Sequence, residues 1–163
     1  MGRMLPCAHE PLATAGRVSC TRPPRLIPMT AISCMLAVDD TPRAVTWYTH
    51  ALDARVLWSL GSVAGLEIGG APFFLHEPVK DRFTSPREIG TTTVRVELFV
   101  DDPDAVMARA LSAGAVLSSD IRDHEAPWGI HRQGSFTDPF GHVWHVGDTS
   151  PLAPLLVASE SRL

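Results

Sequence analysis

The sequence lacks several features that mark common classes of protein. It has no apolar run near the roughly 18 residues that are needed to cross a bilayer. Its three cysteines are too few for a disulfide framework, which favours a reducing cytoplasm. It contains no glycine-rich phosphate-binding loop, no serine nucleophile elbow and no cysteine-based zinc motif. These absences argue against a membrane protein, a disulfide-rich secreted protein and a nucleotide-binding enzyme.

The sequence also has only one lysine, Lys80, and few basic residues beyond its first 28 positions. Residues 1–28 carry four arginines and one glutamate, whereas the rest of the chain carries 10 basic and 17 acidic side chains. Because nucleic acids favour basic surfaces, this acidic body argues against a nucleic-acid partner. The 163 residues, 45% of them apolar, suit one globular domain. We therefore expect a cytoplasmic protein that has neither a nucleic acid nor a membrane as its partner.

The N-terminal residues 1–28 differ in composition from the rest of the chain. They are rich in Pro, Arg and Ser, have no hydrophobic period, and lack the apolar core of a signal peptide. We interpret them as a disordered extension or as sequence upstream of a true start at Met29, with an arginine-rich transit peptide as the alternative. We expect residues 29–149 to form a single domain and residues 150–163 to form a tail.

A turn motif near the C-terminus, Asp138-Pro139-Phe140-Gly141, separates two strand-like runs over residues 134–137 and 142–147. Asp can bond its own backbone two residues on, Pro fixes φ for a turn, and Gly accepts a positive φ. The second run alternates, so that Val143 and His145 share one face. The motif therefore predicts a hairpin whose last strand directs the His145 imidazole to one side of a sheet.

The chain contains two copies of one pattern, which we interpret as a β-α-β-β-β unit. Leu36 to Asp40 is repeated by Leu98 to Asp102 at an offset of 62, and Val56-Leu57 by Val116-Leu117 at an offset of 60. An aspartate and a proline follow the first strand of each copy and favour a helix start. The predicted elements of the first copy are strands over 31–38, 55–60, 63–68 and 72–76 and a helix from about 41 to 52. We expect module 1 over about 30–77, a polar loop over 78–91, module 2 over about 92–148, and a cleft shared by the two modules.

These motifs resemble the glyoxalase/bleomycin-resistance/dioxygenase superfamily, also called the vicinal oxygen chelate (VOC) superfamily, and within it the PhnB-like branch. The resemblance covers roughly residues 30–148. It implies an α+β fold in which two βαβββ modules form a cupped, mixed or antiparallel sheet. Many members are homodimers that share the cleft, so we expect a homodimer. The matching segments are Leu36–Asp40, Trp47–Ala54, Gly65–Gly69, Leu98–Asp102, Ala113–Ala115, Trp128-Gly129, Arg132 and Asp138–Trp144.

Metal-using members of this superfamily place His or Glu side chains at four strand positions that face the cup. The resemblance assigns these positions to Ser33, about Phe74, Arg95 and His145. Serine is a poor ligand, phenylalanine is none, and a guanidinium is cationic. The resemblance therefore implies that the usual metal site is lost, and our leading expectation is that the protein has no cofactor.

Strand alternation offers a different set of metal ligands, because residues 74 and 76 share a face, as do residues 95 and 97. His76, Glu97 and His145 would then form the 2-His-1-carboxylate set of non-haem Fe(II) oxygenases. The first two are displaced by about 6–7 Å along their strands from the usual positions. The alternative is therefore a divalent metal (Fe, Mn, Zn or Ni) held by these three residues. Ordinary roles also remain open: a strand end for His76, and an ion pair with Arg95 or Arg132 for Glu97.

Without a metal, the cup would be an aromatic-walled pocket with a few polar anchors. Such pockets suit small planar or amphipathic molecules, and an arginine can hold a carboxylate or phosphate by a bidentate contact. The alternative interpretation is that Arg95 and Glu97 form an ion pair at the edge of the cup and bind no ligand. The residues that we assign to ligand binding are Ser33, Phe74, Arg95, Trp128 and Arg132.

Three functions from different classes remain open. The leading hypothesis is a protein that sequesters a small molecule without a metal, as bleomycin-resistance members of the superfamily do. The second is a metal-dependent lyase, isomerase or dioxygenase in which the metal on His76, Glu97 and His145 polarises adjacent substrate oxygens. The third is a metal-free enzyme in which His145 acts as general base beside Arg95. In an enzyme, His145 and Glu97 would be the catalytic residues.

Overall fold

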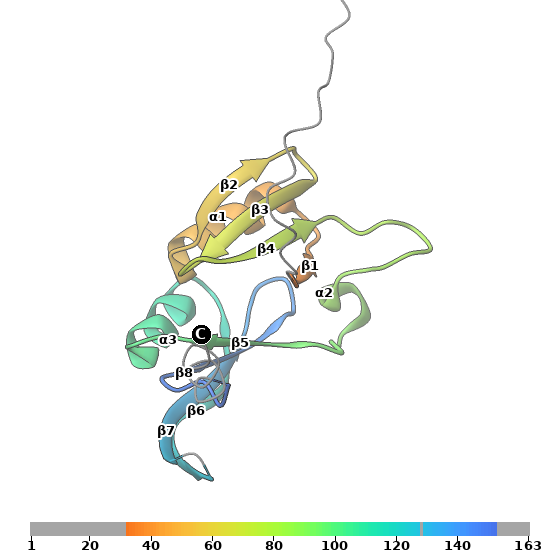
Figure 1. Cartoon of the computed structure of the whole chain (residues 1–163). Helices are drawn as coiled ribbons and strands as arrows, with labels where there is room; N and C mark the ends of the chain where they lie inside the picture. The colour runs from red at the N-terminus through yellow and green to blue at the C-terminus, as the bar shows by residue number, and fades with distance from the viewer. Residues whose placement is uncertain (1–31, 128, 153–163) are drawn as a thin grey trace, which may run out of the picture. The chain divides into compact units, whose positions relative to one another are not determined.

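The computed structural model describes residues 32–127 and 129–152, and these form two modules of the same architecture (Figure 1). This arrangement confirms the predicted α+β fold with two βαβββ modules. The predicted extension over residues 1–28 and most of the predicted tail lie outside the described residues. Module 1 consists of β1 (Met35–Ala37), α1 (Thr41–Leu52), β2 (Arg55–Ser59), β3 (Val63–Ile68) and β4 (Ala71–His76). Module 2 consists of β5 (Arg95–Phe99), α3 (Pro103–Ser112), β6 (Val116–Ala126), β7 (Gly129–Thr137) and β8 (Val143–Gly147).

Each module contributes one four-stranded sheet, and the two sheets have the same topology. Sheet 1 has the order β1-β4-β3-β2 and sheet 2 the order β5-β8-β7-β6. In each sheet the first pair, β1 with β4 or β5 with β8, is parallel, and the other pairs are antiparallel. Among the described residues, no helix has both the length and the apolar character to cross a membrane.

The strand register corrects one detail of the predicted repeat. Val56 pairs with Leu66 on β3, and Leu117 pairs with Phe136 at the corresponding place on β7. Both ladders then become irregular at the next residue of the outer strand. Val56 therefore corresponds to Leu117, at an offset of 61 rather than 60. The two Val-Leu pairs are identical in sequence at an offset of 60, but the strand register shifts them by one residue relative to each other.

The two main helices begin in the same way. The Asp40 carboxylate accepts a hydrogen bond from the Arg43 N–H at 2.9 Å, and the Asp102 carboxylate accepts one from the Ala105 N–H at 2.9 Å. A proline occupies the first turn of each helix. A capping carboxylate satisfies one of the N–H groups that have no partner within the helix, and proline in the first turn removes another such group. The predicted helix starts are therefore confirmed in both modules.

Two segments differ from the predicted elements. The polar loop contains a short helix, α2 (Pro86–Ile89), which is capped by the Ser85 side chain. The strand predicted to begin at residue 134 begins at Gly129 instead, because β7 pairs along the full length of β6. Within this longer hairpin, His124 and His131 are cross-strand partners whose rings stack 5.7 Å apart.

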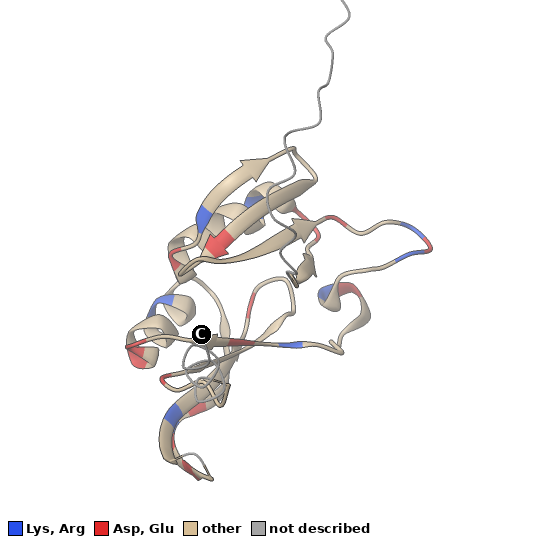
Figure 2. Ribbon diagram, in the orientation of Figure 1, with Lys and Arg blue, Asp and Glu red and all other residues tan. Residues whose placement is uncertain are grey.

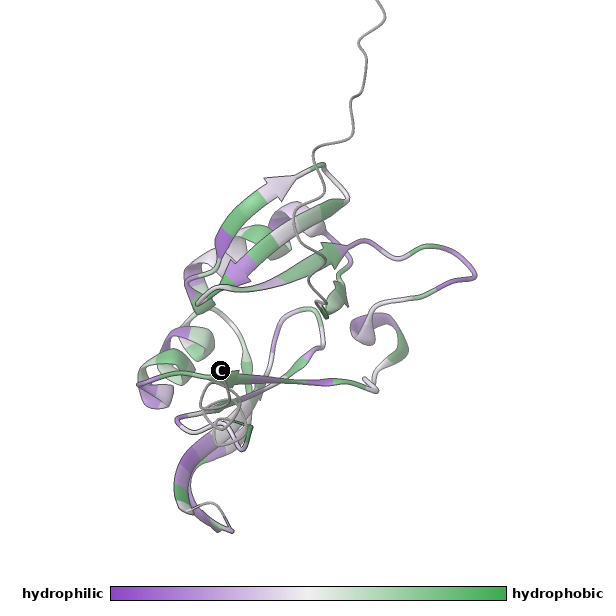
Figure 3. Ribbon diagram, viewed as in Figure 1, coloured by the Kyte–Doolittle hydropathy of each residue, from purple (hydrophilic) through white to green (hydrophobic). Residues whose placement is uncertain are grey.

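The two modules share one hydrophobic core. The Trp144 ring of β8 lies 5.7 Å from the Tyr48 ring of α1 and 6.4 Å from the Phe73 ring of β4. Helix α1 also contacts α3. Figure 3 shows hydrophobic residues along the strands of both modules, whereas the hairpin of β6 and β7 is mainly hydrophilic. Both sheets thus turn one face toward this shared core, and we call the opposite face of each sheet its outward face.

A buried carboxylate joins the modules at the centre of this core. Asp138 is only 4% exposed. Its side chain accepts hydrogen bonds from the Tyr48 hydroxyl at 2.6 Å and from the Trp144 indole N–H at 2.9 Å. It also accepts the backbone N–H groups of Phe140 and His142, each at 2.9 Å. Because buried polar groups are costly without partners, this network ties helix α1 firmly to the β7–β8 turn.

Tyr48 allows a direct test of this network, because it is the only tyrosine of the chain. Burial and the Asp138 carboxylate raise the pKa of its phenol well above the ordinary value of 10.0. The unfolded chain loses this proton first, so the stabilisation is fully present below about pH 10 and declines at higher pH. We expect ultraviolet absorbance at about pH 10 to show no tyrosinate in the native protein, and tyrosinate in denaturant-unfolded protein.

The variant Tyr48→Phe removes one hydrogen bond to a charged group and should lower the free energy of unfolding by about 1.5–3 kcal/mol in urea titrations. Thr49→Ala is the matched control on the exposed side of the same helix, where the hydroxyl bonds the Val45 carbonyl. We expect that control to change stability by no more than about 0.5 kcal/mol. Equal stability of Tyr48→Phe and the native protein would contradict the role assigned to the network.

Candidate functional site

The outward face of sheet 2 carries a row of polar side chains in register. Glu97 pairs with His145, His145 with Ser135, and Ser135 with Ser119. Neighbouring Cα atoms in such rows lie about 4.5–5.5 Å apart, so their side chains are within contact distance. We call Glu97, His145, Ser135 and Ser119 the polar row. Figure 2 shows that β5, the strand at the edge of sheet 2, carries both a basic and an acidic residue.

Arg95 extends this group along β5. Its Nε lies 2.6 Å from Oε1 of Glu97 and a terminal nitrogen lies 2.5 Å from the same oxygen. The Arg95 side chain is nevertheless 56% exposed. An exposed ion pair of this kind contributes little to stability, so the two residues are available for other contacts. The predicted Arg95–Glu97 ion pair is therefore present, and it lies beside His145.

His145 lies between these charges and the serines of the polar row. Partial burial lowers the pKa of its imidazole below 6.5, and the Arg95 guanidinium lowers it further, whereas Glu97 acts in the opposite direction. The imidazole is therefore neutral near pH 7. A neutral imidazole offers one hydrogen-bond donor and one acceptor, and it can also accept a proton. The predicted orientation of His145 toward one side of the sheet agrees with this arrangement.

Two serines complete the polar row, and sequence reasoning missed both. The hydroxyls of Ser135 and Ser119 lie 2.8 Å apart, and Ser135 is buried. Only the strand register reveals that they share a face with His145. Ser135 and Phe136 are consecutive on β7, so their side chains lie on opposite faces of the sheet. The position of Ser119 cannot be found by counting residues, because the ladder is irregular between Leu117 and Ser119.

The outward face of sheet 1 carries the corresponding row, and this row is apolar. Met35 pairs with Phe74, Phe74 with Gly65, and Gly65 with Trp58. The Trp58 and Phe74 rings lie 5.9 Å apart. Met35 is 47% exposed, and Trp58 and Phe74 are each 38% exposed. We call Met35, Phe74, Gly65 and Trp58 the apolar row; it contains the predicted ligand-binding residue Phe74.

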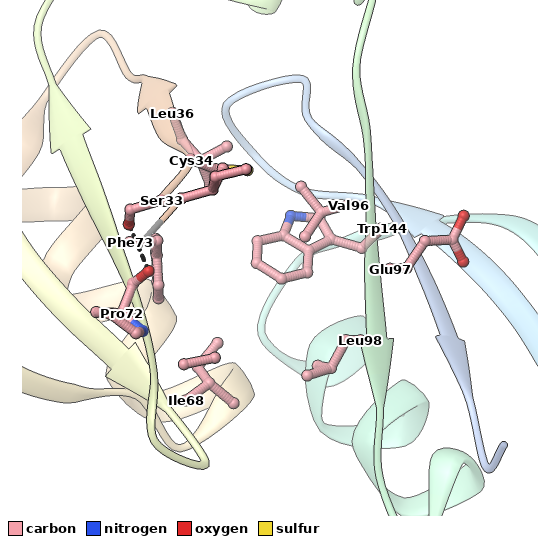
Figure 4. Close-up of a pocket in the computed structure, with 12 residues that line it drawn as sticks. Ser33, Cys34, Leu36, Ile68, Pro72, Phe73, Val96, Glu97, Leu98 and Trp144 are labelled. Atoms are coloured by element: carbon pink, nitrogen blue, oxygen red, sulfur yellow. Dashed lines mark hydrogen bonds between the residues drawn. The ribbon is translucent and has the colours of Figure 1, made fainter. Parts of the chain in front are cut away.

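Ser33 lies where the edges of the two sheets approach each other. Its hydroxyl donates to the Pro72 carbonyl at 2.6 Å, so it is engaged with the backbone of β4. Together with Glu97 it borders a crevice of about 190 Å³ between the modules. Figure 4 shows Phe73 and Trp144 lining this crevice, with the Glu97 carboxylate pointing away from it. The crevice is thus on the core side, whereas the carboxylate belongs to the outward face.

The structure does not bring His76 together with Glu97 and His145 in one chain. His76 belongs to sheet 1, where its ring packs edge-to-face on Phe83 at 5.3 Å and its Nδ1 lies 2.6 Å from the Glu77 carbonyl oxygen. In the part of the chain that the structure describes, no three His, Cys, Asp or Glu side chains are grouped for a metal ion. The donors of a single chain therefore do not fit the proposed metal set.

Arg132 is engaged on the core side of sheet 2, where α3 packs. Its guanidinium contacts the Asp104 carboxylate at 2.7 and 2.8 Å and the Asp123 carboxylate at 3.1 Å. These hydrogen bonds raise the pKa of Arg132, and the contact with Arg132 lowers the pKa of Asp104. Arg132 is thus separated by the sheet from the polar row. Trp128, the other predicted residue of this region, lies outside the described residues.

Comparisons with known proteins agree with this architecture. Residues 33–147 match the family model of the glyoxalase-like domain. An uncharacterized protein of Mycobacterium tuberculosis is 37% identical over 127 residues, which cover 72% of this chain and 73% of the relative. An uncharacterized protein of Mycobacterium bovis has the same identity over 127 residues, and the match covers 72% of this chain and 82% of the relative.

Solved structures of the same fold include TioX from Micromonospora sp. ML1, with 27% identity and a TM-score of 0.57. That match covers 73% of this chain and 98% of TioX. The fosfomycin resistance protein FosX from Mesorhizobium loti has 16% identity and a TM-score of 0.54, over 79% of this chain and 99% of FosX. The latter likeness concerns the fold alone.

The electrostatics of His145 can be tested by nuclear magnetic resonance titration of its imidazole. We expect it to titrate below the ordinary value of 6.5, because of partial burial and the nearby guanidinium. Arg95→Gln should raise the pKa of His145, and Glu97→Gln should lower it further. The variant His145→Gln assigns the signal. If Arg95→Gln left this pKa unchanged, the two side chains would not be close neighbours in solution.

Proposed function

Because the chain belongs to the glyoxalase-like domain family, we propose that it binds a small anionic molecule on the outward face of sheet 2, without a resident metal ion. The observation that carries the proposal is the exposed guanidinium of Arg95 beside a neutral His145. Sequestration of such a molecule is the simplest function of this face. The PhnB-like branch and a cytoplasmic location remain proposals as well, supported by the quoted motifs and by the few cysteines.

Arg95 supplies the positive charge for the ligand. It contacts Glu97 through Nε and one terminal nitrogen, and more than half of its side chain is open to solvent. A carboxylate or phosphate could therefore approach the guanidinium in the bidentate geometry that this group favours. Glu97 would accept a hydrogen bond from an O–H or N–H group of the same molecule. Neutral His145 can donate to or accept from the ligand, as its tautomer allows.

We propose further that a second copy of the chain covers the ligand. The polar row and the apolar row lie on outward faces of different sheets, on opposite sides of the shared core. One outward face covers only one side of a molecule, whereas binding pockets usually bury about 70–90% of a ligand. The exposed side chains of the apolar row also favour a covering partner. In a homodimer, the apolar row of one copy would close the polar row of the other.

An enzymatic role is the alternative, and the lowered pKa of His145 favours it specifically. A base that is neutral at pH 7 can remove a proton from a bound substrate, while Arg95 stabilises the negative charge that develops. Glu97 would position the substrate in that reaction. A metal-dependent lyase, isomerase or dioxygenase would require His76 of the partner subunit to complete the set with Glu97 and His145, since one chain does not assemble it.

Calorimetric titration with small carboxylates and phosphonates tests the binding proposal. Arg95→Gln should weaken the best ligand about 10- to 100-fold, because it removes a charge-assisted contact. Arg122→Gln is the matched control, since Arg122 forms an exposed ion pair with Asp120 on β6. Equal losses in the two variants, or no loss in Arg95→Gln, would contradict the assignment of Arg95.

Elemental analysis of the purified protein separates the metal-free functions from the metal-dependent enzyme. We expect the full chain, and the chain that begins at Met29, to contain far less than one equivalent of Fe, Mn, Zn or Ni. His145→Ala should not change these contents. Near-stoichiometric metal that disappears in His145→Ala would reject the metal-free proposal and support the metal-dependent enzyme. Sedimentation analysis of the same samples reports whether the chain dimerises.

A further inference from the structure

Gly65, at the centre of the apolar row, has an unusual reason to be glycine. It is not among the described glycines with positive φ, so its backbone conformation is open to any residue. The restriction is space instead. A Cβ placed on Gly65 would lie 2.6 Å from both Cε2 and Nε1 of Trp58. Any other residue would therefore have to displace the indole.

This contact shows how Trp58 lies on the sheet. Trp58 is the cross-strand partner of Gly65, and its six-membered ring and Nε1 approach the place where a Cβ would be. The indole therefore lies across β3 instead of standing away from it. Its ring also reaches within 5.9 Å of the Phe74 ring on β4, at an interplanar angle of 43°. Glycine at position 65 thus lets two aromatic rings form a continuous surface.

The surface remains accessible despite this packing. Trp58 and Phe74 each keep 38% of their area exposed, whereas Trp47 and Trp144 are 9% and 2% exposed. The Arg55–Glu67 ion pair, at 2.9 Å, lies in the neighbouring row and gives the aromatic surface a polar border. An exposed aromatic surface with a charged rim is typical of a binding site rather than of a core.

We propose that Gly65 creates a stacking platform from Trp58 and Phe74, and that the ligand of this protein is an aromatic carboxylate whose flat ring stacks on Trp58. The inference rests on the proposed function, in which Arg95 receives the carboxylate. In the homodimer the ring lies on the apolar row of one copy and the carboxylate meets Arg95 of the other. Ring stacking selects flat molecules over saturated ones of similar size, because only a flat π-system can make full contact with an indole face.

The matched ligands for the test are naphthoate and cyclohexanecarboxylate, which share their charge but not their flat ring. We expect titrations of tryptophan fluorescence and heat to show that the protein binds naphthoate more tightly, by roughly two- to tenfold or more. Trp58→Leu should abolish this preference while it retains binding of cyclohexanecarboxylate. Equal binding of the two ligands by the native protein, or a preference that persists in Trp58→Leu, would overturn the inference.

Gly65→Ala tests the platform itself. It should reduce the preference for naphthoate and lower the midpoint of urea unfolding, because the methyl group must displace the indole. In a Trp58→Ala background the same change should no longer lower the midpoint, since the space is then empty. If Gly65→Ala destabilised both backgrounds equally, the clash with Trp58 would not be the reason for glycine. The background comparison remains informative even if Gly65→Ala alone folds poorly.

Two further binding experiments distinguish failure of this inference from failure of the proposed function. Arg95→Gln should weaken both carboxylates to the same degree and leave the ring preference intact. Naphthalenemethanol, which has the ring without the charge, should still quench fluorescence in native protein but not in Trp58→Leu. If naphthalenemethanol binds at Trp58 and no carboxylate binds through Arg95, the proposed function fails and the platform stands. If carboxylates bind through Arg95 without a ring preference, only the platform fails.

Discussion

The buried carboxylate of Asp138 is the contact on which the arrangement of both modules depends. It accepts hydrogen bonds from Tyr48 of module 1 and from Trp144 of module 2, and it also closes the turn before β8. A carboxylate buried in an apolar core is tolerated only if its oxygens are hydrogen-bonded. Because these donors come from both modules, the modules meet in one orientation. That orientation places the functional rows on the outward faces.

The two rows occupy equivalent places in the repeat but have opposite chemistry. Met35, Phe74, Gly65 and Trp58 correspond by register to Glu97, His145, Ser135 and Ser119. One module therefore offers an aromatic surface and the other offers a charged and hydrogen-bonding surface. A homodimer that joins the two surfaces would hold amphipathic molecules. A dimer that joins two identical surfaces would lack this complementarity.

Much of the fold was predictable from local signals. The aspartate caps with their prolines, the Asp138-Pro139-Phe140-Gly141 turn and the repeated strand motifs each specify a short segment, and each agrees with the structure. The orientation of His145 and its proximity to Arg95 followed from alternation. Features that depend on register or on tertiary packing did not follow: the irregular ladders hid Ser119, and no local pattern shows that Arg132 pairs with Asp104 of α3. Alternation along the strands also does not show which face of sheet 1 packs toward which face of sheet 2.

The position of both rows on outward faces has a consequence for how the protein can change. The side chains that hold the modules together lie on the core side, so residues of a row can be exchanged without opening a cavity in that core. Gly65 is the exception, because a side chain at this position would displace the Trp58 indole. Each half of the site can therefore acquire new residues separately, and the same scaffold can serve unrelated ligands in different descendants of one ancestral chain.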